Sequence, residues 1–250
     1  RGPQGGFARF DRLREGLPVW TRAVDETILA PISYYNGRMY VAGNEGTLEA
    51  VEATADGTLA WEKTLGAAVL AEMHVDARGC FVPCGDGRIY AYAPASGVEL
   101  WRPFVCEDVL RTPVQVGDST IFQLCGSGRF YAVKLDDGTE RWSRRDLRRA
   151  VASFGGTAYV LDRRRRLALV NEVLGTTRAR MPIGALRVWA SNTSEPALYA
   201  GTPDGRVFCL RSEDAEPLTP EDMEEGSAAL GVPAAGASNG AAGPAPAGGE

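Results

Sequence analysis

The sequence predicts an all-β protein built from repeated four-stranded antiparallel units, and two periodic patterns carry this prediction. The first is a tryptophan that recurs about every 40 residues, each time four residues after a glycine. The second is a short segment in which a glycine precedes alternating apolar residues, in phase with the tryptophans. The tryptophans and their glycines are Trp20, Trp61, Trp101 and Trp142 with Gly16, Gly57, Gly97 and Gly138. Such a period marks a repeat whose single unit cannot bury its apolar face alone.

The glycine-led segment has six copies. Gly46, Gly87, Gly128 and Gly205 open the four clearest ones, such as Gly-Arg-Ile-Tyr-Ala-Tyr from Gly87. Residues 6–11 form a weaker copy, and Arg165 takes the glycine position in another. Ala179 stands where a fifth tryptophan would be, so we expect one weak junction between repeats there.

The unit that ends at Trp142 shows how each repeat divides into strands. Strands are expected over residues 112–116, 121–124 and 130–134 and around Trp142, separated by turns at 117–118, 126–128 and 136–138. Asp-Gly and Gly-rich pairs supply the positive φ angles that tight hairpins require. Four antiparallel strands in about 40 residues correspond to one β-propeller blade. Helical repeats of similar length are excluded because glycine or proline interrupts nearly every ten residues.

The spacing Ala91, Gly97, Trp101 recurs at Ala132, Gly138, Trp142 and resembles the tryptophan-docking motif of PQQ-like (pyrroloquinoline-quinone-type) propellers. The resemblance covers about residues 6–212. It implies that each tryptophan stacks on the backbone of the following repeat and locks two blades together. A large aromatic side chain at a fixed position suits such a junction, so the four tryptophans and their glycines are interpreted as structural docking residues and not as a ligand site.

About five blades are expected, as a fragment of a ring of seven or eight. The alternative is a closed ring of five, in which the strand around Trp20 completes the blade begun by residues 198–210. We assign residues 1–212 to the blades. Residues 213–250, first acidic and then rich in Ala, Gly and Pro, are interpreted as a disordered tail or linker.

The resemblance covers both quinoprotein dehydrogenases and non-catalytic scaffolds of the BamB-like branch. The chain has no adjacent cysteine pair and no recognisable grouping of calcium ligands, so we expect no enzyme activity and no cofactor, PQQ with calcium included. A protein-interaction scaffold in the periplasm or cell envelope is the preferred interpretation. The alternatives are a sensor or ligand-binding propeller of a larger signalling protein and a fragment of a PQQ-dependent dehydrogenase.

Charge and reactive residues narrow the function further. Eight of the 32 acidic residues follow Ser212, which leaves 27 basic and 24 acidic residues in the blades, too small an excess for nucleic-acid binding. No apolar run is long enough to span a membrane.

The run 163–166 is interpreted as solvated arginines at a hairpin turn. His74 is the only histidine, and the five cysteines are interpreted as small apolar packing residues. The expected partner is an unidentified protein.

Overall fold

Four sheets of four antiparallel strands make up most of the described chain. The computed structural model describes residues 5–10, 18–54, 56–190 and 197–211. Contacts divide the chain into Arg1–Arg211 and Ser212–Glu250, and the predicted tail lies outside the described residues. Among the described residues, no helix is long and apolar enough to cross a membrane.

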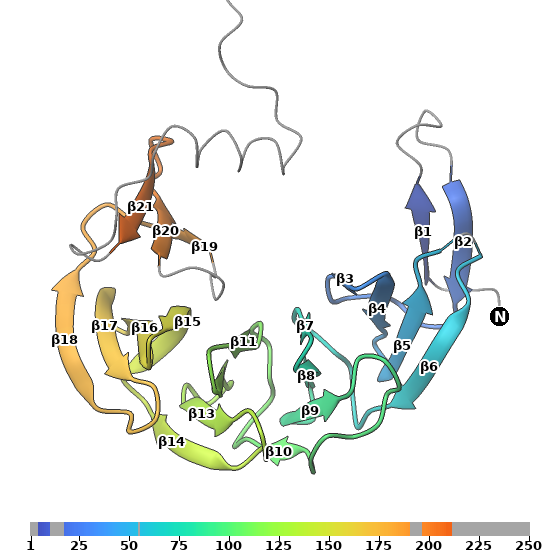
Figure 1. Cartoon of the computed structure of the whole chain (residues 1–250), viewed down its shortest axis with the longest axis horizontal. Helices are drawn as coiled ribbons and strands as arrows, with labels where there is room; N and C mark the ends of the chain where they lie inside the picture. The colour runs from blue at the N-terminus through green and yellow to red at the C-terminus, as the bar shows by residue number, and fades with distance from the viewer. Residues whose placement is uncertain (1–4, 11–17, 55, 191–196, 212–250) are drawn as a thin grey trace, which may run out of the picture. The chain divides into compact units, whose positions relative to one another are not determined.

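Each complete sheet is formed by four strands that are consecutive in the sequence (Figure 1). Within the sheet, each strand is hydrogen-bonded to the strands that precede and follow it in the chain. This is the connectivity of a propeller blade and confirms the predicted fold class. The first blade is β3 (Ser33–Tyr35), β4 (Arg38–Ala42), β5 (Thr47–Glu52) and β6 (Leu59–Thr64). The second is β7 (His74–Asp76), β8 (Gly79–Pro83), β9 (Arg88–Tyr92) and β10 (Phe104–Val105). The third is β11 (Gln115–Val116), β12 (Thr120–Leu124), β13 (Phe130–Lys134) and β14 (Glu140–Arg144). The fourth is β15 (Leu147–Phe154), β16 (Thr157–Asp162), β17 (Arg166–Asn171) and β18 (Thr177–Pro182).

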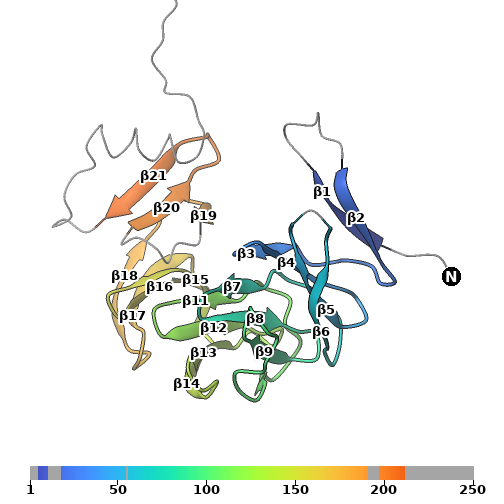
Figure 2. The ribbon, with the colours of Figure 1, turned by 45° about the vertical axis from the view of Figure 1, so that its right-hand side comes forward.

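Two smaller sheets precede and follow the four blades along the chain (Figure 2), and among the described residues no strand pairing joins one to the other. One pairs β1 (Gly5–Phe10) with β2 (Pro18–Val24); the other orders β19 (Val188–Ala190), β20 (Ala197–Gly201) and β21 (Val207–Arg211). The strand that carries Trp20 is therefore hydrogen-bonded to β1 and not to β21. The alternative of a five-bladed ring closed through that strand is wrong, because the weak copy at residues 6–11 already supplies its partner.

A bulge between the third and fourth strands explains the spacing of the docking motif. The register shifts between Ala50 and Val51, and again between Ala132 and Val133, so that Ala50 lies opposite Trp61 and Ala132 opposite Trp142. A small residue opposite each indole leaves room for the large ring. The fourth blade inverts the pair: Leu169 lies opposite Ala179, so a larger third-strand residue accompanies the loss of the tryptophan.

The second blade departs from the expected strand around its tryptophan. Trp101 lies outside any strand, and the fourth strand is reduced to Phe104–Val105. Pro103 intervenes, and because proline has no backbone N–H it cannot donate to the ladder of β9.

The apolar core lies between blades. One cluster joins Tyr40 and Leu48 of the first blade to Cys80 and Val82 of the second. A later one joins Phe122 of the third blade to Val160 and Val170 of the fourth. Stability therefore depends on each interface between neighbours, as in other repeat proteins.

Candidate interaction surface

The four repeated tryptophans all cross to the next blade in the chain. In each case the indole N–H donates to a backbone carbonyl just after the third strand of the following blade. The distances are 2.6 Å for Trp20 to Thr54, 2.9 Å for Trp61 to Pro94, 3.1 Å for Trp101 to Leu135 and 2.9 Å for Trp142 to Glu172. Each pairing satisfies a buried indole donor while the ring fills the junction.

A glycine of the following blade lies directly beneath each indole. A β-carbon at Gly57 would come within 2.8 Å of the Trp20 ring, and one at Gly97 within 2.7 Å of the Trp61 ring. Gly138 lies equally close beneath Trp101. All three have positive φ, between 64° and 71°. The structure therefore brings together the expected tryptophans and three of their glycines; Gly16 lies outside the described residues.

Sequence reasoning missed the glycine that receives Trp142. Gly175 has a φ of 70°, and a β-carbon there would lie 2.6 Å from the Trp142 ring. A signal existed, because Gly175 precedes Ala179 by the same four residues that separate the other glycines from their tryptophans. Because Ala179 replaces the tryptophan, the four-residue spacing from Gly175 is not marked by the glycine–tryptophan pair.

The junction after the fourth blade uses other contacts in place of an indole. Ala179 is exposed in β18, while Val151, Leu167 and Trp189 form a buried cluster with β20. The Arg149 guanidinium also donates to the carbonyl of Trp189 at 3.1 Å. The stability of this junction, expected to be weak, remains a prediction.

The turns between the second and third strands are joined to the connections between blades. A backbone N–H of each turn donates to a carbonyl of the connection that enters its blade. We call residues 43–46, 84–87, 125–128 and 162–165, together with these connections, the turn rim. The bonds are Asn44 to Thr27 at 2.9 Å, Gly85 to Ala68 at 2.8 Å, Gly126 to Val109 at 2.9 Å and Arg163 to Asp146 at 2.9 Å. The rim is thereby a fixed surface, although it consists of loops.

The turn of the fourth blade has an arginine in a left-handed conformation. Arg165 has a φ of 59°, and the corresponding Gly46, Gly87, Gly128 and Gly205 have φ between 81° and 101°. The sequence interpretation of Arg165 as the glycine equivalent is confirmed. A side chain at such a φ strains the backbone, which glycine avoids.

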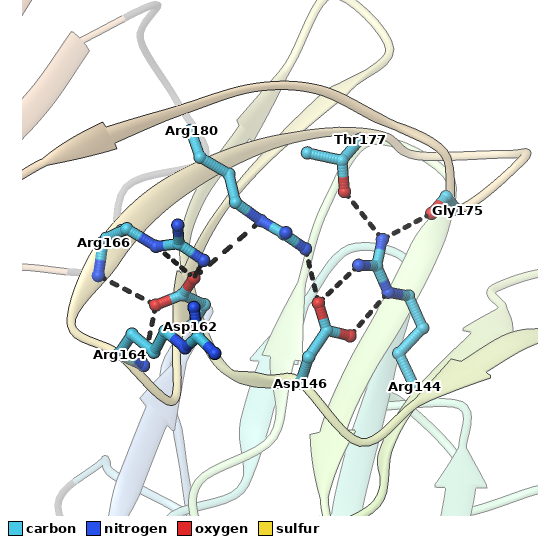
Figure 3. A network of polar contacts seen from close by, with 8 residues as sticks. All are labelled: Arg144, Asp146, Asp162, Arg164, Arg166, Gly175, Thr177 and Arg180. Atoms are coloured by element: carbon cyan, nitrogen blue, oxygen red, sulfur yellow. Dashed lines mark hydrogen bonds and ion pairs between the residues drawn. The ribbon is translucent and has the colours of Figure 1, made fainter.

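Asp162 holds this turn together from the end of β16 (Figure 3). Its side chain is 3% exposed. One carboxylate oxygen accepts from the backbone N–H groups of Arg164 and Arg166, both at 2.9 Å, and the other accepts from the Arg166 guanidinium at 2.9 Å. Arg166 is thus part of the structure, which corrects the interpretation of the whole run as solvated.

Arg144 and Arg180 extend this network across the blade junction (Figure 3). Arg180 bridges the carboxylates of Asp146 and Asp162. Arg144 pairs with Asp146 through both ends of its guanidinium and also donates to the Gly175 carbonyl at 2.9 Å. Gly175 therefore receives both Trp142 and Arg144 from the third blade.

Both carboxylates of the network have lowered pKa values. The Arg144 guanidinium is the main cause of the lowered pKa of Asp146. Burial by itself would raise the pKa of Asp162, but the backbone N–H and guanidinium of Arg166 outweigh it and lower this pKa. Both groups are therefore charged at neutral pH and remain bonded to their arginines.

The side chains of three arginines of the turn take no part in the ion pairs of this network. The side chains of Arg163, Arg164 and Arg165 are exposed, and no ion pair within the described residues engages their guanidinium groups. We call these three residues the arginine turn. Nearby, exposed Arg145 pairs with Glu107 at 3.0 Å.

Comparison with known proteins identifies the family. A family model described as outer membrane protein assembly factor BamB matches residues 85–218, more than half of the chain. The chain belongs to this BamB family of PQQ-like repeat proteins. No curated protein matches the chain.

A solved BamB structure shares the fold of this BamB-family chain. BamB from Moraxella catarrhalis is 19% identical, with a TM-score of 0.55 over 78% of this chain and 62% of that one. This chain therefore spans under two thirds of that protein. The computationally designed Ika4 protein is 12% identical, with a TM-score of 0.45 over 74% of this chain and 91% of that one.

Most reactive side chains of this BamB-family chain are engaged in packing or in ion pairs. Cys209 is exposed in β21, which corrects the interpretation of all five cysteines as apolar packing residues. His74 contacts Asp76 at 3.1 Å, and Asp76 also binds Arg78. Burial raises the pKa of the Cys84 thiol to about 11 and raises those of Cys80 and Cys106 as well. Within the described ranges, no group of three or more His, Cys, Asp or Glu residues is placed to hold a metal ion.

One half-open cavity of about 330 Å³ lies between β2 and the first blade. Its polar centre is the Arg22 and Glu49 pair, bonded at 3.0 and 3.1 Å. Glu26, also in its wall, accepts from the backbone N–H of Glu45 at 2.8 Å and bonds the Thr47 hydroxyl. These groups bond one another and connect β2 to β5. The cavity therefore belongs to the contact between two sheets, and its polar groups already have partners.

Proposed function

We propose that this chain is a non-catalytic propeller that binds a protein partner through the turn rim, in a bacterial cell envelope. The observation that carries the proposal is the repeated bond from each turn to the preceding connection, made in all four blades at 2.8 to 2.9 Å. A loop surface that is already ordered loses little conformational entropy when a partner binds. Loops positioned by a rigid scaffold are also the usual location of binding residues.

The surroundings of the buried cysteines and of His74 support a non-catalytic role without a cofactor. A nucleophilic cysteine needs a lowered pKa, whereas burial raises those of Cys80, Cys84 and Cys106. Asp76, which could orient His74 as a base, is also bound by Arg78 and by the Arg78 backbone N–H at 2.8 Å. These contacts stabilise turns and blade interfaces.

The envelope setting is supported by the family. The matching model is described as an outer membrane protein assembly factor, and a structural relative is BamB of Moraxella catarrhalis. Fold alone does not fix function, so the proposal depends on whether the rim binds a partner.

Site-specific photo-crosslinking tests the proposal. A photoreactive residue replaces Glu45, Ser127 or Arg164, which are exposed on the rim. Matched controls carry it at Ala77 or Asp118, exposed turn residues between first and second strands and hence at the opposite end of the blades. We expect one protein of the producing cell's envelope fraction to cross-link from rim positions only. Equal cross-linking from both ends, or none from the rim, would contradict the proposal.

A titration with PQQ and calcium tests the non-catalytic part. We expect no change in absorbance spectrum or unfolding midpoint. A midpoint that rises with PQQ concentration would overturn it, because a ligand that binds only the folded state stabilises that state.

A further inference from the structure

The arginine turn retains backbone strain that its sequence could avoid. The matching position is glycine in the other three complete blades and in the sheet β19–β21. Arg165 adopts the same left-handed conformation with a β-carbon present, and arginine is not among the residues enriched there. Strained residues persist where the surrounding structure over-determines them, and they cluster at functional sites. The strain at Arg165 points to a use for its side chain.

The backbone beneath the three arginines is fixed on both sides. Arg163 N–H donates to the Asp146 carbonyl at 2.9 Å, and Arg165 N–H donates to the Asp162 carbonyl at 3.0 Å. The buried Asp162 carboxylate holds the rest of the turn (Figure 3). Three adjacent exposed arginines are therefore carried by a backbone that is already ordered, which reduces the ordering cost of binding.

The surroundings leave the arginine turn with an excess of positive charge. The carboxylates of Asp146 and Asp162 are already shared among Arg144, Arg166 and Arg180. Glu107 is shared by Arg129 and Arg145. Six arginines lie in the turn and in its bonded network against the two carboxylates of Asp146 and Asp162: Arg144, Arg163, Arg164, Arg165, Arg166 and Arg180.

We infer that the arginine turn binds a short carboxylate-rich segment of the protein partner. This inference rests on the proposed function, since it assigns part of the turn rim to a class of partner. Guanidinium groups bind carboxylates through two parallel hydrogen bonds, which combines charge with geometric specificity. Three such groups on one turn match three carboxylates within a few residues of an extended segment.

The rest of the rim favours a protein segment over a nucleic acid or a lipid surface. Glu45, Glu107 and Asp108 are exposed on the rim turns or their connections. A polyanion or an anionic membrane plane would meet these carboxylates as well as the arginines and would be repelled by them. A short acidic segment contacts the arginine turn alone.

Peptide binding to the full chain tests the inference. The probe is a fluorescent ten-residue peptide with glutamates at alternate positions, compared with the same peptide carrying glutamines. The test variant combines Arg163→Gln, Arg164→Gln and Arg165→Gln. A control with equal charge loss combines Arg102→Gln, Lys134→Gln and Arg178→Gln, basic residues away from the rim turns.

We expect the glutamate peptide to bind at least about tenfold more tightly than the glutamine peptide, and less tightly at high salt. The test variant should lose about tenfold in affinity, and the control should change less than about twofold. Arg165→Gly provides a second variant that should fold normally, because glycine suits the local φ. It should weaken peptide binding without lowering the unfolding midpoint. Equal losses in test and control variants, or no peptide binding by the unmodified chain, would overturn the inference.

Two further experiments distinguish failure of this inference from failure of the proposed function on which it rests. Duplex DNA of similar charge and vesicles containing anionic phospholipid are titrated in parallel; tighter binding to either would overturn the choice of a protein segment. The test variant is also cross-linked from Ser127 with the envelope fraction. A rim-specific adduct that persists undiminished would overturn the inference and leave the proposed function standing. Loss of that adduct supports both.

Discussion

The indole of Trp142 covers Gly175 of the following blade so closely that a β-carbon added there would lie 2.6 Å from the ring. The indole N–H reaches the Glu172 carbonyl three residues earlier at 2.9 Å. A tight turn of one blade thus forms the docking site of its neighbour. Similar contacts at three other junctions explain why the motif pairs a glycine with a tryptophan.

Gly175→Ala should destabilise the protein more than Gly156→Ala in the same blade. The two glycines have φ of 70° and 67°, but nothing lies within 4 Å of a β-carbon at Gly156. Both changes carry the left-handed penalty of about 1–2 kcal/mol, and only Gly175→Ala adds overpacking of about 1–3 kcal/mol. Urea unfolding followed by tryptophan fluorescence measures the difference. Equal free energies of unfolding for the two variants would refute the docking role of Gly175.

Trp101→Ala should lower the free energy of unfolding by about 3–5 kcal/mol, the usual cost of truncating a buried tryptophan. The ring is 7% exposed and its N–H donates to Leu135 of the next blade. Trp101→Phe should cost less, because much of the apolar contact remains. Thermal and urea unfolding of both variants provide the measurement, and a loss below about 1 kcal/mol for Trp101→Ala would be inconsistent with a buried contact.

Asp162→Asn should destabilise the protein at neutral pH by about 1.5–3 kcal/mol, the range for hydrogen bonds to charged groups, because half-buried Arg166 and Arg180 lose their charge partner. The pKa of Asp162 is lowered in the folded state. Its stabilisation is therefore complete above the ordinary carboxyl pKa, about 3.9, and is lost as pH falls further through the folded pKa. The difference between wild type and variant should be constant from pH 7 to pH 5 and narrow below pH 4. A difference that does not depend on pH would contradict this assignment.

Arg165→Gly should raise the free energy of unfolding by up to about 1 kcal/mol, through relief of left-handed strain partly offset by the entropy of glycine in the unfolded chain. The reciprocal change Gly205→Arg, at a φ of 87° with nothing within 4 Å of an added β-carbon, should lower it by about 1–2 kcal/mol. Chemical unfolding of the two variants gives both values. Opposite signs support strain at Arg165, whereas destabilisation by both changes would show that the arginine side chain stabilises the turn.

Cys209 should be the one cysteine that iodoacetamide modifies rapidly in the folded protein. It is exposed in β21, and the other four cysteines are buried. Burial raises the pKa of Cys80, Cys84 and Cys106, so their thiolate fractions stay small near pH 8. Mass spectrometry after timed labelling counts the modified sites, with urea-unfolded protein as the control. Rapid native labelling of Cys84 would contradict its burial.

The blade fold and the repeat period could be predicted from the sequence, because most turn glycines and docking tryptophans reflect a local requirement that recurs from unit to unit. Those requirements are local in sequence, such as the positive φ of Gly87 or the alternation in β13 (Phe130–Lys134). The repeat period also predicts that Arg165 occupies the glycine position of its turn.

Which residues meet across blades depends on how the sheets pack and does not follow from the repeat pattern. The spacing of Trp142 does not reveal that Gly175 and Glu172 receive it, since that junction is a few residues shorter than the others. Nor does the run of four arginines show that Arg166 is held by Asp162 while the preceding three remain exposed. Such contacts join residues from separate strands and blades, and their partners follow from how the sheets pack against one another rather than from any pattern along one strand.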